Sequence, residues 1–217
     1  SPPGYILSSH SSPHLASSRT SGIPFAPGSP FLSKESPNAC GFFLYAKRRW
    51  KDNCQVDFEI VDATIISDIL KAGMNKNITK VVSNMAIMDI SNIDTMFAAV
   101  GHLLDDKGLF VFSSVHPCFQ NPGMEKIIEY NDYNDRPTIR KGIKIFNYIR
   151  ESIQKTLILA NSEKTAIHYH RPLSVVVKCL SENSLVLDAI EEPVFKSNED
   201  DHFEWSEIPP VIIYRAK

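Results

Sequence analysis

The chain has 217 residues, of which 43% are hydrophobic and 22% charged, as in an ordinary soluble globular protein. This length accommodates one α/β domain with a real core, but hardly two. The formal net charge of -2 gives no electrostatic footprint for nucleic acid or an anionic membrane, so neither is expected as a partner. No apolar run approaches the roughly 20 residues of a membrane span, and the start has no secretory-signal pattern. We therefore expect a soluble, cytoplasmic protein, whose oligomeric state the sequence does not set.

The metal-binding residue types are scattered. The four cysteines include no C-x-x-C pair and no Cys/His cluster at zinc spacing, which favours reduced thiols in a cytosolic protein. His168 and His170 lie two apart on a predicted strand and hence on one face. No third ligand accompanies them at a suitable spacing, so no metal is expected.

The composition changes sharply near residue 38. Residues 1–37 are crowded with Ser, Pro and Gly and show neither helical nor strand periodicity. Such a segment buries too little apolar surface to offset its ordering entropy. We predict a disordered Ser/Pro-rich tail over 1–37 and a folded domain over 38–217. An organellar transit peptide is the alternative interpretation of the tail, although its amphipathic helix is missing.

The first part of the domain alternates helices and strands. Asp105 to Gly108 form a predicted turn between a segment with helical periodicity and an apolar segment that predicts a buried strand. A strand, a helix and a strand joined by short loops form the βαβ unit of a parallel sheet. The predicted helices cover 39–50, 65–72 and 92–104, and the predicted strands cover 56–61, 79–86 and 109–113.

The second part closes the domain. The segment at about 123–163 is polar and irregular, which predicts an insertion or lid. The remaining pattern predicts an α/β fold whose mostly parallel sheet ends in an antiparallel pair of C-terminal strands. The predicted strands lie near 167–170, 186–190 and 211–215, and the predicted helix near 174–181.

Polar residues follow three of the predicted strands, in the loops 62–64, 84–90 and 113–119. In an open parallel sheet, ligands bind outside the carboxyl ends of the strands. The carboxylate of Asp62 can accept hydrogen bonds from an amino-bearing heterocycle, and Asn84 can both donate and accept.

Several motifs, in order, resemble class I S-adenosylmethionine-dependent methyltransferases of the small-molecule type. The resemblance runs from about Phe42 to the end, and the order and rough spacing of the motifs make it specific. The motifs are Asn84 to Ile90, Leu103 to Ser113, His116-Pro117-Cys118-Phe119, Tyr169 to Ser174, Glu192-Pro193 and Ile208-Pro209-Pro210.

The resemblance implies a Rossmann-like fold, S-adenosylmethionine as cofactor and a small-molecule methyl acceptor. Asp62 and Ala63 match the positions that the family places against the adenine. Asn84, Met85 and Ala86 match the end of the strand along which the methionine part of the cofactor passes.

The acceptor side of the pocket would be formed by His116 and by Tyr169 to Arg171. If the acceptor is a hydroxyl or an amine, a general base assists its deprotonation, and histidine suits neutral pH. His116 is the first candidate, with a loop-capping role as its alternative, and His170 is the second. Tyr169 and Arg171 are the predicted substrate-binding residues; Arg171 could instead pair with Glu191 or Glu192.

The family's opening strand and G-x-G-x-G loop have no match, nor does the acidic residue after its second strand. We therefore expect a domain that is incomplete at its N-terminus. A catalytically inactive, truncated methyltransferase-like protein or interaction module is the alternative function. A dinucleotide-dependent oxidoreductase is a third possibility, but it also requires a glycine-rich motif that the sequence lacks. The 84–90 motif would have no role in such an enzyme.

Overall fold

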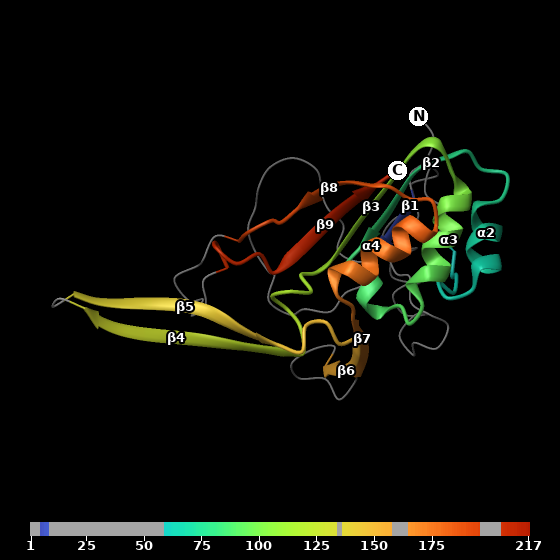
Figure 1. Cartoon of the computed structure of the whole chain (residues 1–217). Coiled ribbons are helices and arrows are strands. Elements are labelled where there is room, and N and C mark those ends of the chain that lie inside the picture. The colour runs from blue at the N-terminus through green and yellow to red at the C-terminus, as the bar shows by residue number, and fades with distance from the viewer. Residues whose placement is uncertain (1–4, 9–58, 134–135, 158–164, 196–204) are drawn as a thin grey trace, which may run out of the picture.

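The computed structural model describes residues 5–8, 59–133, 136–157, 165–195 and 205–217. A five-stranded sheet is covered on one face by helices, and two further pairs of strands lie outside this sheet (Figure 1). Among the described residues, no helix is both long and apolar enough to cross a membrane.

The central sheet is parallel on one side and antiparallel on the other. Its first three strands run parallel, and β9 runs antiparallel to both of its neighbours. The predicted α/β class, with a mostly parallel sheet and an antiparallel C-terminal pair, is therefore confirmed. In spatial order the strands are β1 (Tyr5–Ser8), β2 (Ile78–Asn84), β3 (Leu104–Val115), β9 (Val211–Ala216) and β8 (Leu187–Glu191).

Strand β1 lies inside the segment that was expected to lack secondary structure. It pairs with β2 from Tyr5 opposite Val81 to Ser8 opposite Asn84. Tyr5 and Ile6 are of residue types that favour strands. The strand could not be predicted from the sequence because four residues are too few to show an alternating pattern. The rest of 1–37 lies outside the described residues, so the division into tail and domain stays a prediction.

Two other predicted elements fall largely outside the described residues. The helix over 39–50 lies there entirely. The strand over 56–61 is described only from residue 59, and residues 59–61 are not in a strand. The chain at this point already leads into the turn that precedes the first described helix, so the predicted strand is wrong for these three residues.

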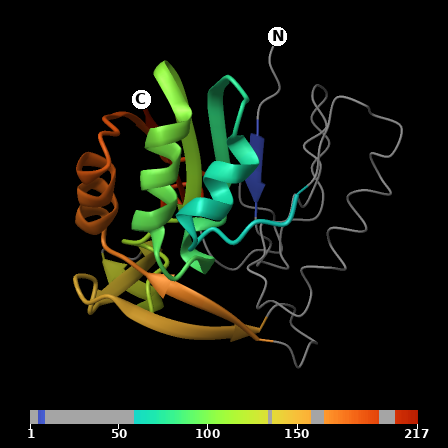
Figure 2. The same cartoon turned by 90° about the vertical axis from the view of Figure 1, so that its right-hand side faces the viewer.

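Helices α2 (Ile66–Gly73), α3 (Ile93–Leu103) and α4 (Leu173–Glu182) lie side by side on the sheet (Figure 2). Helix α3 begins at Asn92, whose side-chain oxygen accepts the N–H groups of Asp94 and Thr95. This satisfies two of the amides that a helix N-terminus leaves without partners. Asn92 is therefore the N-cap of α3.

The core is built around four aromatic rings. Phe97 of α3, Phe110 and Phe112 of β3 and Tyr214 of β9 are at most 1% exposed. The Phe112 and Tyr214 ring centroids are 4.6 Å apart, and those of Phe110 and Phe112 are 4.7 Å apart. Because the rings come from three elements, their burial locks α3 onto the parallel–antiparallel junction of the sheet.

The predicted turn at 105–108 is an irregularity inside β3. Leu104 pairs with Ile78 and Leu109 with Lys80, so four residues of β3 face one residue of β2. A β-carbon at Gly108 would lie 2.8 Å from the Leu104 side chain and 3.0 Å from the Asp105 carbonyl oxygen. The chain thus turns at this point as predicted, but β3 pairs with β2 both before and after the turn.

The segment at 123–163 is more regular than predicted. Strands β4 (Gly123–Tyr133) and β5 (Arg136–Phe146) form a hairpin that extends away from the body (Figure 1). Opposite charges face each other across it, with Glu125 opposite Lys144 and Glu129 opposite Arg140. The expectation of irregular structure is therefore wrong for these strands; a role as a lid stays a prediction.

A second strand pair follows the hairpin. Strands β6 (Ser152–Leu157) and β7 (Thr165–His170) pair antiparallel. They lie at the end of the sheet toward which the parallel strands point (Figure 2). β7 packs there against a short 3-10 helix, η1 (Ile87–Asp89), which follows β2.

Truncating the aromatic core should destabilise the fold. We expect Phe112→Ala to lower the free energy of unfolding by about 3–5 kcal/mol, because it removes a large buried ring and leaves a cavity. Urea denaturation measures the loss. Phe146→Ala is the matched control, since the Phe146 side chain is 49% exposed on β5; similar losses for the two variants would contradict this account of the core.

Tyr214 should make stability fall in alkaline solution. Burial, reinforced by negative charge on Tyr148, Cys118 and Glu192, raises the pKa of Tyr214 above its ordinary value of 10.0. Since the folded pKa exceeds the unfolded one, the resulting stabilisation is fully present below about pH 10 and is lost as the pH rises above that value.

Tyr214→Phe should remove this alkaline component. Its hydroxyl is buried without a hydrogen-bond partner among the described residues, so at neutral pH the variant should be at least as stable as the wild type. Urea titrations from pH 7 to 11 test both points, with exposed Tyr130→Phe as control. A steeper alkaline loss in Tyr214→Phe than in the wild type would refute the assignment.

Candidate active site

The carboxyl ends of β2 and β3 are joined by one serine of β3. The Ser113 hydroxyl donates to Asn84 Oδ1 at 2.6 Å, and the Met85 N–H lies 2.9 Å from Ser113 Oγ and 3.1 Å from its carbonyl oxygen. Met85 has a φ of 50°, a left-handed conformation that few non-glycine residues adopt. Ser113 was not among the predicted site residues, although its position directly after an apolar run was the available signal.

The predicted cofactor residues of this loop differ in exposure. Asn84 is exposed, Met85 is half-buried and Ala86 is buried. Because Asn84 Oδ1 already accepts the Ser113 hydroxyl, its Nδ2 group keeps two hydrogens to donate. The loop therefore presents an amide donor at the carboxyl end of β2.

Asp62 and Ala63 form the turn that leads into α2. Asp62 Oδ1 accepts the N–H of Thr64 at 2.9 Å and its hydroxyl at 2.7 Å, while the Asp62 carbonyl accepts the N–H of Ile65 at 3.1 Å. Ala63 is 8% exposed and belongs to the core. The carboxylate is thus held in a fixed direction by its own turn.

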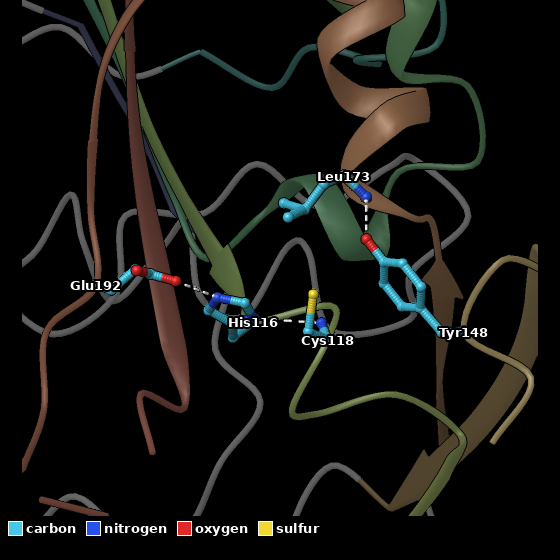
Figure 3. Close-up of polar contacts among 5 residues, drawn as sticks. All are labelled: His116, Cys118, Tyr148, Leu173 and Glu192. Carbon is cyan, nitrogen blue, oxygen red and sulfur yellow. Dashed lines mark hydrogen bonds and ion pairs between the residues drawn. The ribbon is translucent and has the colours of Figure 1, made fainter. Parts of the chain in front are cut away.

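His116 is buried, and both ring nitrogens are bonded within the protein (Figure 3). Its Nδ1 accepts the N–H of Cys118 at 3.2 Å, which places the proton of the neutral ring on Nε2. Nε2 then donates to Glu192 Oε1 at 2.7 Å. This arrangement holds the His116–Phe119 turn and links the residue after β3 to the residue after β8, across the intervening strand β9.

His170 is also engaged by its neighbours. Its Nε2 donates to the backbone carbonyl of Tyr148 at 2.7 Å. The Tyr148 hydroxyl accepts the N–H of Leu173 at 2.9 Å, at the N-terminus of α4 (Figure 3). Burial, and contact with the Cys118 thiol, raise the pKa of Tyr148, although the Leu173 N–H opposes this shift.

Arg171 ties the end of β7 to the segment after β2. Its guanidinium donates to the carbonyl oxygens of Ile87 at 3.0 Å, Ile90 at 2.6 Å and Ser91 at 2.8 Å. Burial lowers the pKa of Arg171. The pairing with Glu191 or Glu192 considered from sequence is not formed, since Glu192 bonds His116 instead.

Tyr169 lies next to this clamp, with its ring centroid 5.1 Å from the guanidinium carbon of Arg171. The two predicted substrate-binding residues are therefore brought together by a cation–π contact. Among the described residues, no group of three or more His, Cys, Asp or Glu side chains could hold a metal ion.

Replacing the Arg171 fork by a single ammonium should loosen η1. We expect Arg171→Lys to lower the free energy of unfolding by about 2–4 kcal/mol, because the three donors of an ammonium lie on one atom and cannot reproduce the spread of the planar guanidinium across three carbonyls. Urea denaturation gives the loss, and hydrogen exchange should be faster at the Asp89 and Ile90 amides, which bond within η1.

Arg215→Lys is the matched control for this prediction. Arg215 pairs with Asp188 on the surface, through contacts at 2.8 and 3.3 Å, and solvent screens such pairs. Equal losses of stability in the two variants, or unchanged exchange at η1, would show that the Arg171 clamp is not what holds this segment.

Comparison with known proteins identifies the fold of the chain. No protein-family model and no curated protein sequence matches the chain. A solved structure described as an S-adenosylmethionine-dependent methyltransferase from Listeria monocytogenes matches with a TM-score of 0.59 and 19% identity, covering 83% of this chain and 76% of that one.

A second such methyltransferase, from Mesorhizobium loti, matches with a TM-score of 0.56 and 19% identity, again covering 83% of this chain and 76% of the other. At this identity the likeness establishes the fold, and it agrees with the resemblance seen in the motifs. The chain therefore has the Rossmann-like fold of S-adenosylmethionine-dependent methyltransferases.

Proposed function

We propose that the chain is an S-adenosylmethionine-dependent methyltransferase that acts on a small-molecule acceptor. The observation that carries the proposal is the polar loop Asn84–Ala86, which Ser113 holds in place at the carboxyl ends of two adjacent parallel strands. Ligands of open α/β sheets bind at this edge. The two solved structures compared above are described as S-adenosylmethionine-dependent methyltransferases.

In this proposal the cofactor lies along two loops. Asp62 accepts hydrogen bonds from the adenine and Ala63 packs beside it, while Asn84, Met85 and Ala86 follow the methionine part. The Nδ2 hydrogens of Asn84, which bond nothing among the described residues, suit a carboxylate or hydroxyl oxygen of the ligand. The left-handed backbone at Met85 changes the direction of the chain directly after β2.

Bound S-adenosylmethionine supplies an activated methyl group, so the chain mainly contributes proximity, alignment and exclusion of water. His116, Tyr169, His170 and Arg171 form the acceptor-side wall in this proposal. For either predicted base to take a proton through Nε2, His116 would have to release Glu192 and His170 would have to release the Tyr148 carbonyl. Their present bonds suit them to positioning that wall.

The first measurement is calorimetric titration of the full chain with S-adenosylhomocysteine, which fills the same pocket without reacting. We expect saturable binding at micromolar affinity. Asp62→Ala and Asn84→Ala should each weaken it about tenfold, the equivalent of one hydrogen bond worth about 1.4 kcal/mol.

Asp106→Ala provides the matched control, because Asp106 is exposed near the start of β3, at the opposite end of the strand from the site. It should bind like the wild type. Failure of the folded wild-type chain to bind would overturn the proposal and favour the non-catalytic interpretation.

A further inference from the structure

A histidine and an aspartate outside the predicted set face each other at this end of the sheet. His168 of β7 and Asp89 of η1 approach to 3.5 Å between Nε2 and Oδ1. Their side chains are 16% and 24% exposed, so the pair is largely shielded from water. The packing of β7 on η1 brings them together from positions 79 apart in the sequence.

The surroundings of His168 indicate which nitrogen carries the proton. Nε2 is buried and has no hydrogen-bond partner at normal distance within the described part of the chain, and the Asp89 carboxylate faces it at 3.5 Å. A carboxylate at this position favours a proton on Nε2. The lone pair of a neutral ring is then on Nδ1, for which the described residues provide no hydrogen bond.

His168 differs in this respect from the two predicted bases. His116 uses both nitrogens for bonds to Cys118 and Glu192, and His170 donates Nε2–H to a backbone carbonyl. Only His168 combines a carboxylate partner on one nitrogen with an unoccupied second nitrogen among these three. A contact of 3.5 Å is long for a hydrogen bond, but such contacts tighten when a substrate closes the site.

The pair also lies close to the proposed cofactor loop. Asp89 is the last residue of η1 and follows Asn84 by five positions. The Arg171 clamp holds the carbonyls of this same segment against the end of β7. The fold therefore keeps His168 in a fixed relation to the residues expected along the methionine part of the cofactor.

We propose that His168, oriented by Asp89, is the proton acceptor of the methyl transfer, and that the acceptor is a hydroxyl or amine that loses a proton. This inference rests on the proposed function. The acceptor's lone pair forms the bond to the methyl carbon, the carbon–sulfur bond breaks, and its electron pair stays on sulfur. The acceptor's proton goes to His168 Nδ1, and the Asp89 carboxylate stabilises the resulting imidazolium.

The orientation can be tested without an acceptor. In protein labelled with 15N-histidine, NMR at neutral pH should show His168 as the Nε2–H tautomer, with an unprotonated Nδ1. Asp89→Asn should weaken this preference, because an amide can donate as well as accept. An Nδ1–H tautomer in the wild type, or an identical tautomer population in Asp89→Asn, would overturn the proposal.

Catalysis is tested with tritiated S-adenosylmethionine and a deproteinised, low-molecular-mass cell extract as the acceptor pool. His168→Ala should reduce methyl transfer by about 10²–10⁴-fold while leaving the affinity for S-adenosylhomocysteine unchanged. Added imidazole should restore part of the rate, which it would not do if His168 only tied β7 to η1. His102→Ala, on the exposed part of α3, should behave like the wild type.

The outcomes separate the two proposals. Absence of S-adenosylhomocysteine binding in the wild type would overturn the proposed function, and this inference with it. Normal binding by His168→Ala combined with an unchanged rate, or a lost rate that imidazole does not restore, would overturn only the role of His168.

Discussion

The guanidinium of Arg171 is the contact on which the geometry of the site depends. It brings together two parts of the chain that the sheet itself does not join, the end of β7 and the segment after β2, through three carbonyl oxygens. Burying a cation is unfavourable and lowers the pKa of Arg171, and the three charge-assisted bonds offset that penalty. Because the 3-10 helix η1 carries Asp89 and β7 carries His168 and Tyr169, this one side chain sets the position of the proposed cofactor loop relative to the proposed acceptor side.

Behind the site, a rigid core keeps the strand ends in place. The stacked rings of Phe110, Phe112 and Tyr214 join the last parallel strand to the antiparallel one, and Phe97 holds α3 against them. Ser113 lies near the carboxyl end of β3, so its hydroxyl is placed where it can bond both Asn84 and the Met85 amide. The close-packed core thus fixes the position of the polar loop, and a site that aligns reactants requires such fixed positions.

The three histidines near the site show how neighbours decide the role of one residue type. His116 is held between a backbone amide and Glu192, and His170 is bonded to a carbonyl, so both stabilise the loops that carry them. His168 faces a carboxylate across a longer gap. The same imidazole group therefore braces a turn through both nitrogens at His116, bonds a carbonyl through Nε2 at His170, and faces a carboxylate at His168.

The sequence by itself determined the element types and the fold class, because helical periodicity at 92–104 and the apolar run at 109–113 report local burial that tertiary contacts then preserve. It also indicated the polar loops after the strands. It did not reveal the Tyr5–Ser8 strand, which is too short to show a period, or the β4–β5 hairpin, whose charged cross-strand pairs read as a polar segment. Only the tertiary structure decided which distant groups meet: Arg171, His116 and His168 each have partners that lie 76 to 84 positions away. Contacts over such separations depend on how the elements pack, and no local pattern in the chain encodes them.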